Sequence, residues 1–497
     1  MQCDSFAHYE LQTILSETDY SKRATKIICT IGPACWDVPT LVQLIDAGMS
    51  VARLNFSHGD HKVHGETVAK LREAFKQRKD KPVAIALDTK GPEIRTGLNK
   101  EHKQIVLKKG QKLEITTDYS FEGTSECIPC SYQSLCKTVH VGSQILIADG
   151  SVVTIVDEIK ENSVIVTVQN DASFGEKKNM SLPGAIIDLP TVTEKEEEDL
   201  VKFGLKHNID IVFLSFTRKA QDIEDVRDIL GPRGSGIKII AKIENQEGME
   251  NYDEILKSAD GIMVARGDLG MEIPPQKVFQ AQKWMIKRAL NAGKPVITAT
   301  QMMESIITNP RPTRAEASDV ANAVLDGTDC VMLSGETANG AFPVIAVETM
   351  GRICCEAEKC VDNEKTYWNR IHDRGYLEDT EALAASAVQM SFETKAHVII
   401  CFTLTGEIAR LVAKYRPRAP IIAISTEDKT IKGLSMTSGV TCLRVPSFQG
   451  VDTLVDYAIK SAKTRGIIKT GDKGIVLLGG SEENPDESNI LKIKKIN

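Results

Sequence analysis

Short apolar segments rich in isoleucine and valine recur along the chain, and each precedes a segment whose apolar residues have helical spacing. Apolar runs of this length predict buried strands. Eight such runs occupy residues 26–31, 51–56, 83–88, 210–215, 237–244, 261–265, 295–300 and 330–334. The helical patterns between them cover 40–47, 61–78, 194–207, 219–230, 275–291 and 313–325. Strand and helix alternate in this way in a (β/α)8 or TIM barrel, so the sequence predicts an α/β protein of that fold.

Residues 92–188 interrupt this alternation with a different pattern. Their apolar segments are short, β-branched and separated by Gly, Asn and Asp, for example at 112–116, 151–156 and 163–168. This pattern predicts an all-β domain, and we expect a small β-barrel. Because the insertion follows the third strand, it lies at the end of the barrel where active sites form. We therefore expect it to cover the site as a lid.

The last quarter of the chain returns to alternating strands and helices. Strands are predicted at 397–402, 420–424, 441–445 and 473–478, which is typical of an open α/β domain. The predicted organisation lists four parts, namely an N-terminal arm (1–24), the barrel (25–91 and 189–361), the inserted lid (92–188) and a C-terminal α/β domain (362–497). The last of these is a candidate for effector binding or subunit assembly.

One loop of the C-terminal domain has residues suited to binding phosphate. Thr403, Thr405 and Gly406 follow a predicted strand and open a predicted helix. Backbone N–H groups at such a place can hold an oxyanion. The same residues also suit an ordinary capped helix start, and their types do not choose between the two.

Composition limits the partners and the compartment. The 497-residue chain has a net charge of −7, which argues against nucleic-acid binding and against binding to anionic membranes. It contains no apolar run of the roughly 20 residues that a membrane-spanning helix needs. The first residues lack the basic and apolar regions of a signal peptide, and the 12 cysteines show no disulfide framework. We therefore expect a cytoplasmic protein with reduced thiols.

A group of cysteines leaves one metal site open as an alternative. Cys127 and Cys130 form a CxxC pair, with Cys136 and His140 beyond it. A single CxxC pair is a weak signal for zinc, because a structural zinc site needs four ligands at defined spacings.

The strand at 237–244 ends in two side chains of opposite charge. Lys242 and Glu244 are two residues apart, so they project from the same side of the strand. The next strand ends in a glycine turn that carries Asp268. Two carboxylates and an ammonium group at neighbouring strand ends indicate a divalent cation and an anionic substrate. The alternative is a lysine–glutamate pair solvated at the rim of the sheet.

Two other strands end in side chains that carry oxygen atoms. Asn55 and Ser57 lie at the end of the second strand, and Asp88 and Thr89 at the end of the third. Oxygen ligands with a single full negative charge suit a monovalent cation better than a tightly bound calcium ion. These ends of the strands are therefore a candidate site for a monovalent cation.

Further polar residues point to a phosphorylated substrate. Arg53 and Arg95 are candidates for binding a phosphate, which a guanidinium contacts through two hydrogen bonds, although each alone could be a surface salt bridge. Thr300 could bind the substrate or a water molecule, or be structural. Positive charge in fixed positions favours phosphoryl transfer. The chain has neither a Walker loop nor the protein-kinase loops, so barrel loops and lid are expected to hold any nucleotide.

Several of these segments resemble the motifs of pyruvate kinases. The matching runs are 53–58, 87–97, 237–249, 265–270 and 299–304, and the resemblance extends in the same order from about residue 25 to 480. It implies a barrel with an inserted lid, usually assembled as a homotetramer. It also implies transfer of the phosphoryl group from phosphoenolpyruvate to ADP, giving pyruvate and ATP in the last step of glycolysis, with Mg²⁺ (or Mn²⁺) and K⁺ as cofactors.

The resemblance also assigns roles to residues of this chain. The implied catalytic residues are Lys242, which would stabilise the enolate and the phosphoryl group in transit, Thr300, linked to the proton delivered to the enolate carbon, and Arg53. Phosphoenolpyruvate would contact Arg53, Lys242, Gly267, Asp268 and Thr300. Magnesium would be bound by Glu244 and Asp268, and potassium by Asn55, Ser57, Asp88 and Thr89. The nucleotide would contact Asn55, His58, Arg95 and Lys178. Glu93 occupies a position where, in this family, a glutamate accompanies potassium dependence.

The C-terminal domain departs in two places from the members of that family that an effector activates. Glu407 stands where those members usually have an arginine, and residues 479–489 carry four acidic side chains where those members have a longer glycine-rich loop. Because carboxylates repel a sugar bisphosphate, we expect weak or absent activation by fructose bisphosphates.

Two other functions remain open at this point. A lyase that forms pyruvate enolate on a metal in a barrel, such as an aldolase, would share Glu244, Asp268 and an arginine, but it would not need the lid, the monovalent-cation site or Lys178. A non-catalytic relative would be expected to have lost Lys242 or a metal-binding carboxylate, and the chain retains them.

Overall fold

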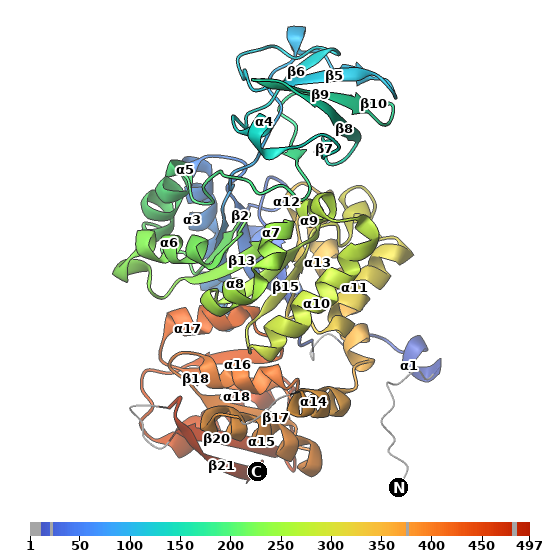
Figure 1. Cartoon of the computed structure of the whole chain (residues 1–497). Coiled ribbons are helices and arrows are strands. Elements are labelled where there is room, and N and C mark those ends of the chain that lie inside the picture. The colour runs from blue at the N-terminus through green and yellow to red at the C-terminus, as the bar shows by residue number, and fades with distance from the viewer. Residues whose placement is uncertain (1–10, 20–22, 374–376, 480–484) are drawn as a thin grey trace.

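The chain folds into three stacked parts. The computed structural model describes residues 11–19, 23–373, 377–479 and 485–497. Figure 1 shows a strand-rich lid at one end, a barrel in the middle and an α/β domain at the other end. Part of the predicted N-terminal arm, residues 1–10 and 20–22, lies outside the described residues, and the described part contains one short helix, α1 (Leu11–Leu15).

Eight parallel strands close into a barrel in the order β1-β16-β15-β14-β13-β12-β3-β2. The strands are β1 (Lys26–Thr30), β2 (Met49–Asn55), β3 (Ala84–Asp88), β12 (Ile211–Leu214), β13 (Lys238–Ile243), β14 (Gly261–Ala265), β15 (Val296–Ala299) and β16 (Cys330–Leu333). Each predicted apolar run overlaps one of them, and the run at 51–56 misses the first two residues of β2, so the predicted (β/α)8 barrel is confirmed.

Helices surround the barrel and cover its strands. The main ones are α2 (Val38–Ala47), α3 (His61–Gln77), α5 (Glu194–Glu198), the π-helix η3 (Asp199–Leu205), α6 (Ala220–Leu230), α8 (Tyr252–Ser258), α10 (Val278–Asn291), α11 (Arg314–Asp326) and α13 (Pro343–Lys359). Local sequence explains their ends. Helix α11 begins after Thr313, whose hydroxyl accepts the backbone N–H of Glu316, and the Glu316 carboxylate binds back to Thr313.

Side chains alternate along the barrel strands between two cores. Residues such as Ile28, Phe213 and Met263 fill the interior of the barrel. Their neighbours, such as Ile27 and Ile262, face outward and pack against the surrounding helices. Because both faces are buried, the strands read as continuous apolar runs in the sequence.

The insertion between β3 and α5 is rich in strands, as predicted. A six-stranded sheet, in the order β11-β7-β8-β9-β5-β6, lies beside the two-stranded pair β10-β4. The strands are β4 (Ile105–Leu107), β5 (Lys112–Thr116), β6 (Cys127–Pro129), β7 (Gln144–Ile147), β8 (Val152–Ile159), β9 (Ser163–Val168), β10 (Ala172–Phe174) and β11 (Met180–Ser181), with the 3-10 helix η2 (Lys100–His102) and the short helix α4 (Leu135–Thr138). Figure 1 shows this domain above the barrel mouth.

Two cysteines of the lid, Cys130 and Cys136, belong to its packing. Cys130 is buried in the lid core, where its thiol lies 3.6 Å from the sulfur of Met180. Within the described residues, no group of three or more His, Cys, Asp and Glu side chains is placed to hold a metal ion. The zinc alternative therefore has no support.

The C-terminal domain is a five-stranded sheet in the order β19-β18-β17-β20-β21 with helices on both faces. Its elements are α14 (Asn363–His372), α15 (Asp379–Thr394), β17 (Val398–Phe402), α16 (Glu407–Lys414), β18 (Ile421–Ser425), α17 (Asp428–Gly433), β19 (Val440–Arg444), α18 (Val451–Thr464), β20 (Lys473–Gly479) and β21 (Ser488–Lys495). The four predicted strands are parallel. Strand β21, which was not predicted, pairs antiparallel with β20 at the edge of the sheet.

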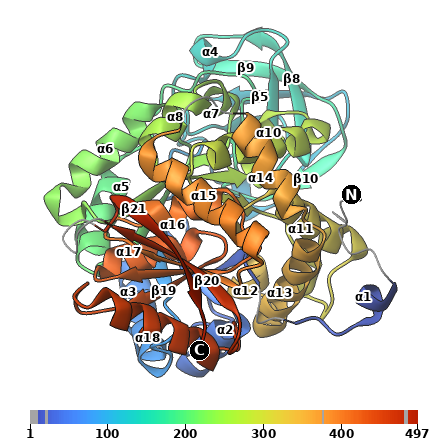
Figure 2. The same ribbon diagram turned by 90° about the horizontal axis from the view of Figure 1, so that it is seen from below.

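This domain closes the floor of the barrel (Figure 2). The 3-10 helix η7 (Leu434–Met436) places Met436 among the side chains of the barrel interior. The thiol of Cys330, at the start of β16, donates to the carbonyl of Met436. The opposite, carboxyl end of the barrel is thus the end left to face the lid. In the part of the chain that the structure describes, no helix is long and apolar enough to cross a bilayer.

Candidate active site

Lys242 lies near the carboxyl end of β13, inside the barrel mouth, and its ammonium group has three partners. Its Nζ atom lies 3.0 Å from Oε1 of Glu244, 3.2 Å from Oδ1 of Asp88 and 2.7 Å from Oγ of Ser215. Lys242 and Glu244 therefore do share one side of the strand, as their spacing predicted. Three contacts fix the ammonium group in one place.

The neighbouring charges keep this site ionised. Burial alone would lower the pKa of Lys242, but the carboxylates of Asp88 and Glu244 raise it above its ordinary value. Burial would likewise raise the pKa of Asp88, yet the cations of Arg53 and Lys242 hold it below its ordinary value. A buried lysine that stays charged near neutral pH is a fixed positive charge aimed into the mouth.

Two carboxylates lie next to each other beside this lysine. Asp268 is in the first turn of α9 (Arg266–Glu272), directly after β14. Burial, and then the negative charge of Glu244, raise the pKa of Asp268 to about 7. The second oxygen of Glu244 accepts the backbone N–H of Phe216. Crowded carboxylate oxygens fit Mg²⁺, which proteins often bind through one or two carboxylates while substrate oxygens and water complete the shell.

Arg53 is held against the same carboxylate as Lys242. Its Nε atom lies 2.6 Å from Oδ2 of Asp88, and its Nη1 atom donates to Oγ1 of Thr30 at 2.8 Å. Asp88 therefore bridges the two cations, with Oδ1 facing Lys242 and Oδ2 facing Arg53. This arrangement gathers two positive groups on one side of the mouth.

The residues with side-chain oxygen atoms at the ends of β2 and β3 lie opposite each other in the sheet register. Asn55 and Asp88 are paired in the register of the two strands, and Oδ1 of Asn55 accepts the backbone N–H of Ser57 at 3.1 Å. The Thr89 hydroxyl accepts the backbone N–H of Ser215 at 3.0 Å. The structure thus brings the predicted monovalent-cation residues together at adjacent strand ends.

Thr300 and Gly267 face each other across the ends of β14 and β15. A Cβ atom on Gly267 would lie 2.8 Å from Cγ2 of Thr300, so only glycine permits this approach. Thr300 has a φ of 73°, a left-handed conformation that costs a β-branched residue energy. The Arg266 guanidinium donates to the carbonyl of Thr300 at 2.8 Å and is itself fixed by Asp319.

Three of the residues predicted to bind the nucleotide lie outside the hydrogen-bonded group around Lys242. The guanidinium of Arg95 donates to the carboxylate of Glu93 at 2.8 Å and to the carbonyl of Lys177 at 2.7 Å. The side chains of His58 and Lys178 are exposed. In the described structure, His58, Arg95 and Lys178 make no hydrogen bond or ion pair with Lys242 or its neighbours.

Three residues after β12 also build the site, and the sequence reading assigned them no role. Ser215 contacts Lys242 and donates to the carbonyl of Thr89 at 2.6 Å. Phe216 has a φ of 53°, which a bulky residue rarely adopts. Arg218 donates to the carbonyls of Ile187 and Leu189, where the chain returns from the lid. For Ser215 and Arg218 a signal was available, because they are polar residues at or just after the end of a predicted barrel strand, as Asp88 and Asp268 are; Phe216 carried no such signal.

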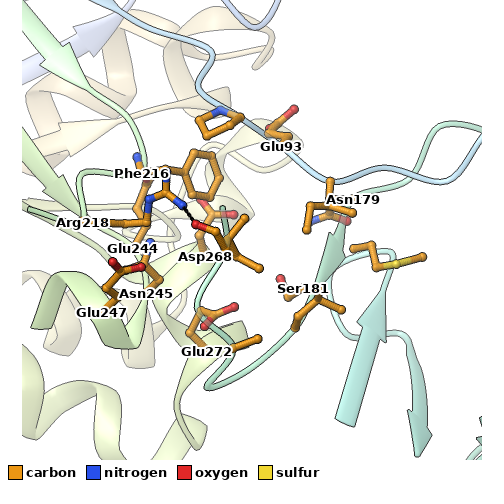
Figure 3. A pocket seen from close by; sticks show the side chains of 16 residues that line it. Glu93, Asn179, Ser181, Phe216, Arg218, Glu244, Asn245, Glu247, Asp268 and Glu272 are labelled. Atoms are coloured by element: carbon orange, nitrogen blue, oxygen red, sulfur yellow. Dashed lines mark hydrogen bonds between the residues drawn. The ribbon is translucent and has the colours of Figure 1, made fainter. Parts of the chain in front are cut away.

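Figure 3 shows how the lid meets this group of residues. Glu244, Asp268 and Glu272 line one side of a pocket, while Asn179 and Ser181 of the lid line the other. Burial raises the pKa of Glu272 to about 7, although the backbone N–H of Gly184 in the lid segment opposes that rise. The pocket is therefore formed jointly by barrel and lid.

Comparison with known proteins agrees with this geometry. Residues 22–347 match the family model "Pyruvate kinase, barrel domain" and residues 381–494 match "Pyruvate kinase, alpha/beta domain". The chain belongs to the pyruvate kinase family. A pyruvate kinase of Eimeria tenella is 54% identical over 96% of this chain and 90% of its own length. A human relative, "Pyruvate kinase PKLR", is 45% identical over 99% of this chain and 88% of its own length.

A solved structure shows the same fold. A crystal structure of a Cryptosporidium parvum pyruvate kinase superposes with a TM-score of 0.94 at 48% identity, covering 98% of this chain and all of that one. The predicted family, fold and enzyme class are confirmed: the chain is a metal-dependent phosphotransferase that acts on phosphoenolpyruvate and ADP to form pyruvate and ATP. The lyase and the non-catalytic alternatives are set aside.

Proposed function

We propose that phosphoryl transfer takes place at the barrel mouth around Lys242, which stabilises the enolate oxygen and the phosphoryl group in transit. The observation that carries this assignment is the fixed ammonium group, held by Asp88, Ser215 and Glu244. Positive charge fixed in a partly dry site stabilises developing negative charge without reorganisation. Phosphoryl transfer depends mainly on such positioning.

Glu244 and Asp268 are the proposed ligands of Mg²⁺ (or Mn²⁺). Burial, and then the negative charge of Glu244, raise the pKa of Asp268, and a divalent cation at this place would favour the ionised form of both carboxylates. When bound, the metal supplies electrostatic neutralisation of phosphate and enolate charge. Asn55, Ser57, Asp88 and Thr89 are the proposed potassium site, supported by their oxygen atoms at the ends of β2 and β3.

Arg53, Gly267 and Thr300 are proposed to orient phosphoenolpyruvate. Arg53 offers a buried guanidinium on one side of the mouth, and Gly267 and Thr300 close the other side. Thr300 is proposed to act in the path of the proton that reaches the enolate carbon. Asp268 would also lie within reach of the substrate, since it sits beside Lys242.

The nucleotide is proposed to bind between barrel and lid, near Asn55, His58, Arg95 and Lys178. Two of these, Arg95 and Lys178, come from segments that enter and leave the lid. Because Arg95 pairs with Glu93 in this structure, nucleotide phosphates must compete with that carboxylate. A cytoplasmic homotetramer is proposed from the family and from plant relatives described as cytosolic isozymes.

Substitution of Lys242 tests the assignment. Lys242→Met should lower kcat by about a hundredfold to a thousandfold or more, because it removes the fixed charge. Pyruvate formation from phosphoenolpyruvate and ADP would be measured in a coupled assay, with and without K⁺. Lys238→Met, on the same strand but at the barrel floor, is the matched control and should retain activity. Near-normal turnover of Lys242→Met would refute the role of this lysine.

A further inference from the structure

The loop between β17 and α16, residues Thr403–Gly406, already holds an anion that belongs to the chain itself. The carboxylate of Asp486 accepts the hydroxyl of Thr403 through Oδ1. Its other oxygen accepts the backbone N–H groups of Leu404 at 3.0 Å and Thr405 at 2.9 Å. Asp486 lies just before β21, in the connection that returns from β20.

These are the donors that an oxyanion would use. Backbone N–H groups at a helix N-terminus, with a hydroxyl beside them, can bind the oxygen atoms of a phosphate or of a carboxylate. The other donors of the loop are also satisfied, because Gly406 N–H donates to Oγ1 of Thr403 at 2.7 Å and Glu407 N–H to Oγ1 of Thr405 at 3.2 Å. From residue 404 to residue 407, every backbone donor has an internal acceptor.

A basic side chain completes the cradle. Nη1 of Arg410, one turn into α16, donates to the carbonyl of Thr405 at 3.2 Å. The left-handed conformation of Gly406, with a φ of 84°, brings the backbone so near that a Cβ atom there would lie 2.9 Å from this guanidinium nitrogen. The Thr403 hydroxyl and two backbone N–H groups thus converge on the Asp486 carboxylate, and the Arg410 guanidinium lies beside the same loop.

We propose that Asp486 is a built-in occupant of an oxyanion cradle, and that it excludes phosphate groups from the C-terminal domain. A phosphate monoester would have to displace a carboxylate that is tethered to the same sheet, and tethered ligands act at a high effective concentration. It would also meet the displaced negative charge. Removal of the Asp486 carboxylate should therefore turn the loop into a binding site for phosphate.

This inference explains the predicted insensitivity to fructose bisphosphates in another way. The acidic residues of 479–489 were expected to repel a bisphosphate, whereas one of them instead binds where a phosphate would. Residues 480–484 of that segment, including two of its four acidic side chains, lie outside the described residues. The inference concerns the C-terminal domain alone, so it stands independently of the roles proposed at the barrel mouth.

The test compares amide hydrogen exchange of the 403–407 segment in the full-length wild type and in Asp486→Ala, with inorganic phosphate as the probe. Loss of charged hydrogen bonds should raise exchange at Leu404 and Thr405 about tenfold or more. Millimolar phosphate should restore protection in Asp486→Ala and leave the wild type unchanged. Potassium chloride at equal ionic strength controls for screening.

Two further variants make the comparison specific. Glu487→Ala removes a neighbouring exposed carboxylate and should behave as the wild type does. Asp486→Asn keeps the shape of the side chain without its charge, so it serves if Asp486→Ala does not fold, and it too should gain a phosphate response. The proposal is overturned if exchange is the same in the wild type and the Asp486 variants, if phosphate protects the wild type equally, or if neither Asp486 variant responds to phosphate.

Discussion

At the level of single residues, Lys242 depends on a hydroxyl that is not itself charged. The hydroxyl of Ser215 accepts a hydrogen bond from the ammonium group and donates a hydrogen bond to the carbonyl of Thr89. It therefore ties the lysine of β13 to the backbone after β3. Without that link, only the carboxylates of Asp88 and Glu244 would hold the Lys242 side chain in its orientation.

Ser215→Ala should lower kcat by about tenfold or more, because a hydrogen bond to a charged group contributes about 1.5–3 kcal/mol. The Michaelis constant for ADP should change little, since Ser215 contacts Lys242 and not the rim. Steady-state kinetics and the unfolding temperature would be measured together. A lower unfolding temperature with unchanged kcat would mean that Ser215 has a purely structural role.

Glu93→Lys should reduce the dependence of activity on potassium, because a fixed cation would replace the mobile one. The structure adds that Glu93 holds Arg95 in an ion pair of 2.5 Å, so the same change releases Arg95. Activity would be titrated with K⁺ at constant ionic strength. An unchanged titration would count against the proposed potassium site.

How much of the site the sequence predicts differs from residue to residue. The two-residue spacing of Lys242 and Glu244 was enough, because side chains alternate along a strand. The pairing of Arg95 with Glu93 was not predictable, since it depends on rotamers in a segment without regular structure. The contact of Ser215 with Lys242 and the φ of 53° at Phe216 depend on local backbone geometry after β12, which no sequence pattern predicts.

At the level of elements, the return segment from the lid is held by one arginine. Arg218 is buried and donates to the carbonyls of Ile187 and Leu189 and to Oγ1 of Thr191. These contacts lie between β11 and α5, where the chain re-enters the barrel. The position of the lid over the mouth therefore depends on hydrogen bonds to backbone rather than on apolar packing alone.

Arg218→Met should loosen this connection while keeping much of the buried volume of the side chain. We expect faster proteolytic cleavage between residues 185 and 192 and a fall of about tenfold in kcat/KM for ADP, because lid closure orients the nucleotide. Arg218→Lys is the control for charge, since lysine lacks the fork that reaches two carbonyls. Wild-type kinetics in both variants would show that lid position does not depend on this arginine.

Strand β21 shows why one element was not predicted. Its segment has only a short apolar alternation, at Leu491 and Ile493, among three lysines, and Ile490 and Ile493 remain about half exposed. An edge strand with basic side chains resembles a polar tail in the sequence. Its pairing with β20 is established by tertiary contact and not by its own pattern.

At the level of the whole molecule, Asp329 joins the barrel to its floor. Its Oδ1 atom accepts the backbone N–H of Ser438 at 3.0 Å and lies 2.9 Å from the guanidinium of Arg416, and Oδ2 accepts the N–H of Val296. One buried carboxylate thus connects the start of β16, the barrel strand beside it and the C-terminal domain.

Asp329→Asn should destabilise the protein by about 3 kcal/mol, because it leaves the partly buried Arg416, whose side chain is 13% exposed, without its buried counter-ion. The matched control is Asp428→Asn, which removes an exposed pair with Arg444 at the same 2.9 Å separation and should have little effect. The midpoint of urea denaturation would be compared for the three proteins. Equal midpoints would show that the buried pair adds nothing to stability.

Because the C-terminal domain forms the floor of the barrel, the order of synthesis leaves the barrel open at first. Strand β16 ends at Leu333, but Met436, which fills the base of the barrel interior, is synthesised later. A ribosome adds about 5–20 residues per second, so the eight barrel strands exist for several seconds before Met436 is synthesised. The nascent barrel thus exposes an apolar opening that a chaperone could shield until the last domain emerges.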